Sequence, residues 1–221
     1  MQTILQQDSR YFNREPEDVV VTDPPFNIGY HYRTYKDKVE KKEWLKLLTQ
    51  VAAPPCVLIL YPELMFDVAR LWDKTPTRTV SWVYPSNTAR QHRMVAWFDV
   101  EPDFRAIGQP YRNPNDRRIR KLIEQGREAR LYDWWEINQV KNVSAEKTAH
   151  PCQMPVEVMR RVVGITPARR IVDPFAGSGT TLVAAKLLGR EAIGMEQDVE
   201  YAEIARQRIE MTPTPEAGTD E

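Results

Sequence analysis

Asp23, Pro24, Pro25 and Phe26 form a short run whose groups can do chemistry on an amino group. The Asp23 carboxylate and the backbone carbonyl of Pro24 can each accept a hydrogen bond from one nitrogen atom. Pro25 stiffens the turn so that both acceptors stay aimed, and Phe26 offers a ring on which a base can stack. Because Asp-Pro-Pro is also a common strand-ending turn, the run alone leaves both interpretations open.

A glycine-rich loop further along the chain supplies a second set of candidate residues. Gly177 and Gly179 lack a Cβ atom, which lets the backbone pass close to a ligand. Thr180 and Thr181 can cap the helix that is predicted to follow, and they offer hydroxyl groups. This loop could hold the ligand that the first run needs as a co-reactant.

Glu196 is predicted to end the next strand, where a carboxylate can accept both hydroxyl groups of a ribose. The loop lacks the Lys-Ser/Thr pair of a P-loop and the full Gly-x-Gly-x-x-Gly spacing of a nicotinamide site, so both are disfavoured. The remaining candidate ligand is a cationic nucleoside that carries an amino acid.

The composition indicates one soluble globular domain. The chain has 221 residues, of which 42% are hydrophobic, and this is enough for one sizeable core. We find no apolar run long enough to cross a bilayer and no secretory signal, so a cytoplasmic protein is expected. Cys56 and Cys152 have neither metal-ligand nor disulfide-framework spacing, so we predict buried thiols and no metal site.

The formal net charge is zero, but the charge is unevenly distributed. Residues 105–130 contain eight Lys and Arg and three Asp and Glu, whereas residues 191–221 contain two and nine. A local basic segment fits a phosphate-contacting surface, although an ordinary solvated helix face has the same composition.

Apolar, β-branched runs alternate with amphipathic runs, which is typical of βαβ units. Strands are predicted at 19–21, 56–61, 79–84, 94–99, 170–173 and 192–196, and helices at 42–51, 62–72, 155–163, 180–188 and 199–209. Residues 27–42 lack a clear period and are expected to form a mobile loop. The prediction is one α/β domain at 1–211 with a doubly wound sheet, an inserted recognition region at about 101–147 with a helix at 115–128, and a disordered tail at 212–221.

The two runs, in this order, resemble motifs of the β group of S-adenosylmethionine-dependent DNA amino-methyltransferases, which act on adenine N6 or cytosine N4. The resemblance extends from Ile4 to Met211, and residues 194–201 are similar to the family's segment of an acid followed by a helix. Because related enzymes place the glycine loop first, the resemblance implies a circularly permuted Rossmann-like methyltransferase sheet.

The resemblance also implies a role for each motif. Asp23, Pro24, Pro25 and Phe26 would act on a base flipped out of double-stranded DNA. The residues implied for S-adenosylmethionine binding are Asp8, His150, Gln153, Asp173, Phe175, Gly177, Gly179, Thr180, Thr181 and Glu196. Met154 stands where a lysine is usual, which is expected to weaken cofactor binding.

The expected phosphate contacts lie in the basic segment. They are Arg112, Arg117, Arg118, Arg120 and Lys121. The adjacent Trp134 and Trp135 suit an interface between two copies equally well, and family members are often homodimers.

Several alternatives stay open. Adenine is preferred because the tetrad begins with Asp, whereas the cytosine enzymes more often begin with Ser. The runners-up are cytosine N4, then RNA adenine, then a methyltransferase-like subunit that has lost activity, and a small-molecule dehydrogenase is a further class. The resemblance implies an enzyme of a bacterium or a phage, and restriction-modification is one setting for it.

Overall fold

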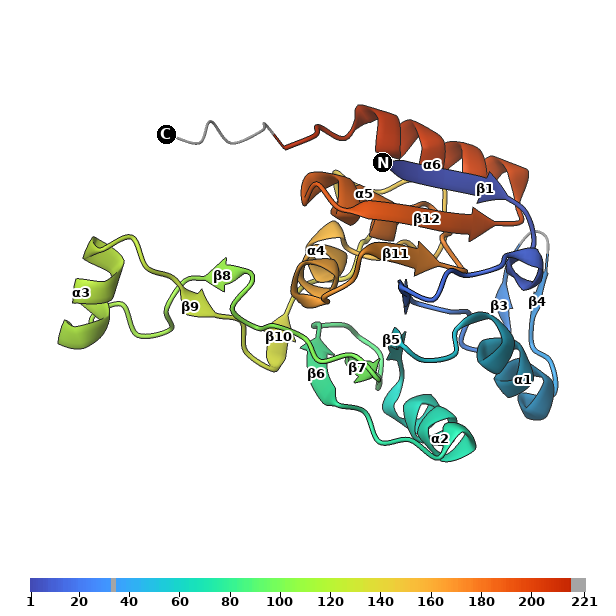
Figure 1. Cartoon of the computed structure of the whole chain (residues 1–221), viewed down its shortest axis with the longest axis horizontal. Coiled ribbons are helices and arrows are strands. Elements are labelled where there is room, and N and C mark those ends of the chain that lie inside the picture. Colours follow the sequence, from blue (N-terminus) through green and yellow to red (C-terminus); the bar gives the residue numbers. More distant parts are fainter. Residues whose placement is uncertain (33–34, 216–221) are drawn as a thin grey trace.

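The structure, a computed structural model, describes residues 1–32 and 35–215 (Figure 1). The predicted tail beyond residue 215 lies outside the described residues. In the described part of the chain, no helix is both long enough and apolar enough to cross a membrane.

A sheet of eight strands forms the centre of the molecule, in the order β1-β12-β11-β2-β5-β7-β6-β10. These strands are β1 (Gln2–Gln6), β2 (Asp18–Thr22), β5 (Cys56–Leu60), β6 (Arg78–Val83), β7 (His92–Phe98), β10 (Trp134–Glu136), β11 (Arg170–Asp173) and β12 (Glu191–Glu196). Every pairing is parallel except the two that β7 makes. The carboxyl ends of the other seven strands therefore share one edge of the sheet with the amino end of β7.

Helices cover both faces of the sheet. The helices of the described residues are η1 (Ser9–Tyr11), α1 (Lys41–Val51), α2 (Pro62–Trp72), α3 (Arg117–Glu124), α4 (Val156–Ile165), α5 (Thr180–Leu187) and α6 (Val199–Met211). Of these, α3 stands apart from the sheet (Figure 1). Val20 of β2 packs in one core cluster with residues of α1 and α2, whereas Val21 packs in the other with residues of α4 and α5. Because both faces are buried, β2 and β5 consist of buried residues alone.

The sheet confirms the predicted α/β class and shows two strands that the sequence analysis missed. The first is β1, which pairs with β12 at one edge of the sheet and has no fully buried residue. The second is β10, which pairs with β6 at the other edge and contains both tryptophans. Trp135 is 1% exposed and belongs to the core, whereas Trp134 is 44% exposed, so only Trp134 is available to a partner.

Two short ladders lie outside the main sheet. One joins β3 (Tyr30–His31) to β4 (Lys36–Asp37) inside the segment expected to be a mobile loop. The other joins β8 (Gly108–Gln109) to β9 (Ala129–Arg130) at the root of α3. The predicted helix at 115–128 is shorter than expected because Asp116 caps its start and the helix ends at Glu124.

Two neighbouring arginines pair with acids at the amino ends of β11 and β2. Arg170 binds Asp18 with two nitrogens, at 2.8 and 2.7 Å, and Asp18 is 2% exposed. Arg169 pairs with Glu17, and both of those side chains are exposed. The two pairs therefore join the same strands in different dielectric surroundings.

Replacing Arg170 with Met should lower the free energy of unfolding by about 3 kcal/mol, because it leaves the Asp18 carboxylate buried without its counter-ion. Arg169→Met is the matched control and should leave this free energy nearly unchanged. Urea unfolding followed by circular dichroism would measure both. Equal losses for the two variants would contradict the assignment of Asp18 as a buried charge that depends on its partner.

Candidate active site

The predicted motifs meet at the edge of the sheet where the parallel strands end. Asp23 directly follows β2, Asp173 ends β11 and Glu196 ends β12, and all three line one cavity of about 800 Å³. The carboxylates of this cavity are Asp8, Asp23, Asp37, Glu43, Asp173 and Glu196. Its cationic side chains are Arg10, Lys46 and Arg93, so the acids outnumber them and the pocket suits a ligand that carries positive charge.

The Asp173 carboxylate ties the two halves of the site together. Its Oδ1 accepts hydrogen bonds from the hydroxyl of Thr22 at 2.6 Å and from the backbone N–H of Phe175 at 3.1 Å. Its Oδ2 accepts one from the hydroxyl of Thr181. Burial raises the pKa of Asp173, and the threonine hydroxyls lower it. Asp173 therefore holds β2 against the start of α5, whereas direct contact with a cofactor stays a prediction.

Glu196 stands beside the glycine loop with both oxygens engaged and a lone pair left on each. Its Oε2 accepts the N–H of Gly177 at 3.0 Å, and its Oε1 accepts the N–H of Asp198 at 2.8 Å. Burial raises its pKa, and these two backbone donors oppose that rise. The carboxylate is thus fixed at the cavity wall, and it can accept two further hydrogen bonds from hydroxyl groups.

The two glycines of the loop serve different purposes. Gly177 has φ of +51° and lines the cavity, and a Cβ atom there would lie 2.8 Å from Nε2 of His150. Gly179 does not line the cavity, and a Cβ atom there would lie 2.8 Å from Cβ of Ala205. Gly179 therefore lets α5 approach α6, which differs from the cofactor contact that the resemblance implies.

The other residues predicted to hold the cofactor also divide into those that line the cavity and those that do not. Asp8, His150, Phe175, Thr180 and Thr181 line the cavity. Asp8 caps η1 and pairs with Arg10, which lowers the pKa of this carboxyl. Burial lowers the pKa of His150 to about 4, so its imidazole is neutral at pH 7.

Gln153 is absent from the cavity lining. Its amide oxygen accepts hydrogen bonds from the N–H and the hydroxyl of Thr148, at 2.9 and 2.8 Å. Its amide nitrogen donates to the carbonyl of Glu146 at 2.6 Å. Gln153 thus shapes the loop ahead of α4 and is not placed to touch a ligand in this cavity.

The tetrad is held rigidly. The indole N–H of Trp44, on α1, donates to the carbonyl of Pro25 at 2.7 Å. Phe26 is 8% exposed. The buried carboxylate of Asp37 accepts hydrogen bonds from the N–H groups of Asn27, at 2.8 Å, and Tyr30, at 3.0 Å. Asp37 therefore orders the residues after the tetrad, although no sequence motif had marked it.

Arg93, near the amino end of β7, is a cation at this site that the sequence analysis missed. Its Nη1 lies 3.2 Å from Oδ2 and 3.4 Å from Oδ1 of Asp23. The pKa of Asp23 is raised to about 6, because burial and the nearby Asp173 raise it more than Arg93 lowers it. Arg93 directly precedes the apolar run 94–98, and this position was the available signal for a charge brought into the interior.

Arg93 also covers Phe26. The guanidinium carbon of Arg93 lies 4.7 Å from the centre of the Phe26 ring, and the Tyr61 ring contacts the same ring edge-on at 4.8 Å. A base that stacks on Phe26 must therefore move at least one of these two side chains. Both Arg93 and Tyr61 line the cavity, so they face the space that such a base would enter.

The basic helix α3 lies far from this cavity. It stands at the end of an arm, residues 99–133 between β7 and β10, which projects away from the sheet. In Figure 1 the arm lies at the end of the molecule opposite β3, β4 and α1. The arm leaves after Phe98, which pairs with Cys56 at the amino end of β5. Arg117, Arg118, Arg120 and Lys121 on α3 are all exposed, so the structure does not bring the predicted phosphate contacts to the cavity.

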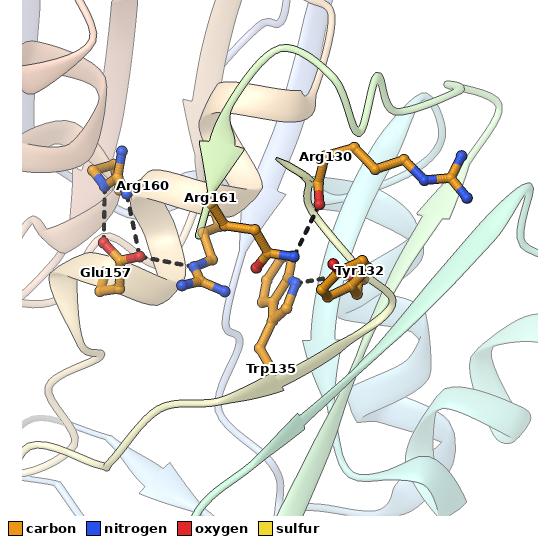
Figure 2. A network of polar contacts seen from close by, with 7 residues as sticks. Arg130, Tyr132, Trp135, Glu157, Arg160 and Arg161 are labelled. Atoms are coloured by element: carbon orange, nitrogen blue, oxygen red, sulfur yellow. Dashed lines mark hydrogen bonds and ion pairs between the residues drawn. The ribbon is translucent and has the colours of Figure 1, made fainter. Parts of the chain in front are cut away.

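The root of the arm is anchored on β10 and α4 (Figure 2). The indole N–H of Trp135 donates to the carbonyl of Tyr132 at 2.8 Å, and Arg161 of α4 lies 5.7 Å from the centre of the Trp135 ring. The fifth predicted phosphate contact, Arg112, lies over the rings of Tyr132 and Trp134, at 4.5 and 5.3 Å. The arm is thus fixed at its root, and its tip is open to solvent.

Comparison with known proteins places this geometry in a family. A family model described as "DNA methylase", of the N6/N4 type, matches residues 66–207. The type II methyltransferase M.BglII of Bacillus subtilis is 27% identical over 235 residues, covering 89% of this chain and 64% of that protein. The type II methyltransferase M.ScaI of Streptomyces caespitosus is 28% identical over 233 residues, covering 87% of this chain and 75% of that protein.

Solved structures show the same fold. The M1.HpyAVI-SAM complex superposes with a TM-score of 0.62 at 20% identity, covering 94% of this chain and 100% of that chain. The PvuII DNA methyltransferase, described as cytosine-N4-specific, superposes with a TM-score of 0.64 at 18% identity, covering 94% of this chain and 86% of that chain. With the family model matching more than half of its residues, the chain belongs to the N6/N4 family of DNA methylases.

Proposed function

We propose that this protein transfers a methyl group from S-adenosylmethionine to the exocyclic N6 of adenine in double-stranded DNA. The observation that carries the proposal is that the Asp23 tetrad and the Gly177–Glu196 contact line the same cavity. One motif suits an amino group and the other suits a nucleoside, so their shared space can bring acceptor and donor together.

The residues of the cavity wall suit S-adenosylmethionine. Glu196 would accept hydrogen bonds from the ribose hydroxyls, and a Cβ at Gly177 would close the gap to His150. The carboxylates of the lining would favour the positive charge of the ligand. The bound cofactor supplies an electrophilic methyl group on a sulfonium.

The tetrad would activate the amino group of the target base. That nitrogen is a poor nucleophile because its lone pair is delocalised into the ring. If the Asp23 carboxylate and the Pro24 carbonyl each accept a hydrogen bond from one N–H of the amino group, the nitrogen becomes tetrahedral and its lone pair points at the methyl group. Asp23 then orients the target nucleobase. Proton loss after the transfer does not require Asp23 to be a strong proton acceptor, because the methylated amine is itself very acidic.

Adenine is our choice over cytosine because the tetrad begins with Asp. Cytosine N4 is the alternative, since it offers the same kind of nitrogen to the same acceptors and one structural neighbour is described as cytosine-N4-specific. RNA adenine and an inactive DNA-binding subunit are weaker alternatives. The target base must leave the helix to reach the buried Asp23. The relatives are bacterial type II methyltransferases, so we propose a restriction-modification role in a bacterial cytoplasm.

The arm places a condition on DNA binding. If α3 contacts phosphates, those phosphates belong to DNA beyond the amino edge of the sheet, away from the cavity of the same protomer. A homodimer in which each arm reaches DNA held by the other copy would satisfy this condition.

Incubation with unmethylated DNA and S-adenosylmethionine, followed by digestion to nucleosides and mass spectrometry, should yield N6-methyl-2′-deoxyadenosine. N4-methylcytosine would keep the mechanism and overturn the choice of base. Lack of product on DNA of varied sequence, with methylation of RNA, would transfer the activity to RNA. Cofactor binding without turnover on any nucleic acid would favour the inactive subunit.

Asp23→Ala should lower kcat by about 10²-fold or more, because it removes one of the two acceptors that activate the amino group. Affinity for S-adenosylmethionine, measured by calorimetry, should change little. If the variant also lost cofactor binding, the role given to Asp23 would be misplaced.

Glu196→Ala should weaken S-adenosylmethionine binding by about 10- to 100-fold, since hydrogen bonds to a charged group contribute about 1.5–3 kcal/mol. Glu203→Ala, on the exposed side of α6, is the matched control. Calorimetric titration of both variants tests the assignment, and unchanged affinity in Glu196→Ala would remove the ribose contact.

Substituting Gln for Arg117, Arg118, Arg120 and Lys121 together should weaken DNA binding and make it less dependent on salt, because fewer counterions are released. Cofactor affinity should be unchanged. Arg206→Gln on α6 is the control for loss of an exposed cation. Fluorescence anisotropy over a salt series measures the effect, and an unchanged salt slope would assign the arm to another role, such as contact between copies.

A further inference from the structure

We propose that Arg93 is a positioning residue for methyl transfer, which acts through Asp23 by holding its carboxylate ionised and aimed into the cavity. This inference rests on the proposed function of the same site. It concerns a residue that lies outside both motifs and comes from the antiparallel strand β7.

The geometry of the ion pair leaves the Asp23 carboxylate able to accept hydrogen bonds from the amino group. One guanidinium nitrogen, Nη1, contacts both carboxylate oxygens, at 3.2 and 3.4 Å. A carboxylate has about four lone-pair positions, so each oxygen keeps one for a proton of the amino group. The pair thus differs from a fork-to-fork arrangement, in which two nitrogens would occupy both oxygens.

The protein holds the Arg93 guanidinium in place on several sides. Its central carbon lies 4.7 Å from the ring centre of Phe26, 5.2 Å from that of Trp82 and 5.8 Å from that of Tyr61. Its Nη1 also lies 3.3 Å from the sulfur of Met154. The side chain is 14% exposed. A cation fixed among rings and away from water interacts strongly with a neighbouring carboxylate.

Arg93 also faces the hydroxyl of Tyr84, and its charge opposes the rise that burial causes in the pKa of that hydroxyl. The Nε of Arg93 is buried and has no hydrogen-bond partner in the part of the chain that the structure describes. The guanidinium is thus enclosed by side chains of the site.

Asp23 needs this counter-ion because its surroundings disfavour its charge. The groups that face it are Arg93 from β7, Asp173 from β11 and Cys152 from the loop ahead of α4. Burial and Asp173 raise the pKa of Asp23 to about 6, whereas Arg93 lowers it. Without Arg93 the pKa would rise further, and a protonated Asp23 would offer fewer acceptor positions to the amino group.

In the wild-type protein, kcat/KM should fall as the pH falls through about 6, where Asp23 takes up its proton. In Arg93→Gln, this decline should occur at least one pH unit higher. At pH 7, kcat/KM should then be about half the wild-type value or lower, and the deficit should shrink as the pH rises towards 9.

Arg93→Lys and the double variant Arg93→Gln/Met154→Lys test charge separately from shape. Because the Met154 sulfur already touches the guanidinium, a lysine there can bring its ammonium to the same carboxylate. Both variants should return the decline towards the wild-type pH. Calorimetric S-adenosylmethionine affinity should stay close to wild type in the two single Arg93 variants. The melting temperature should fall in Arg93→Gln, which leaves Asp23 without its counter-ion, and should fall less in Arg93→Lys.

The outcomes separate the possible failures. If Arg93→Gln lowers kcat/KM equally at every pH, Arg93 only packs the site and the inference is overturned. The same holds if neither lysine variant moves the decline back. If Arg93→Gln does not fold, carbon-13 NMR titration of Asp23 in the wild type decides. A pKa well above 7 would overturn the inference, because Arg93 would then fail to keep the carboxylate ionised. Absence of methyl transfer by the wild-type protein would instead defeat the proposed function.

Discussion

The Asp173 carboxylate is the link on which the arrangement of the site depends. It joins Thr22, at the end of β2, to Thr181, in the first turn of α5, and it also fixes the turn at Phe175. The residue after Thr22 is Asp23, and the residues between Asp173 and Thr181 form the glycine loop. One buried anion therefore sets the distance between the group that would bind the base and the loop that would bind the cofactor.

The strand order makes this link possible. Neighbouring places for β2 and β11 bring together two segments that are far apart in the chain. This arrangement also brings several carboxylates together at one buried edge of the sheet. Burial there raises the pKa values of Asp23, Asp173 and Glu196. Hydroxyls and backbone N–H groups compensate Asp173 and Glu196, whereas Asp23 relies on a guanidinium from β7.

The local sequence predicted the helices and strands whose apolar residues recur with a clear period, and it predicted the motifs that follow those strands. The α/β class, the central strands and the cavity-lining roles of Asp23, Gly177 and Glu196 could be read in this way. The edge strands β1 and β10 could not, because a strand covered on one side lacks a continuous apolar run. Arg93 and Asp37 escaped notice because their importance arises from contacts across the fold, and no spacing along the chain encodes those.

The paired strands at the root of the arm have an evolutionary consequence. Gly108 and Arg130 are partners in the β8–β9 ladder, so their backbones lie about 5 Å apart. The residues between them can be lengthened, shortened or exchanged without moving these two ends. The residues of the arm beyond this ladder can therefore diverge in sequence while the sheet and helices that form the cavity keep their structure.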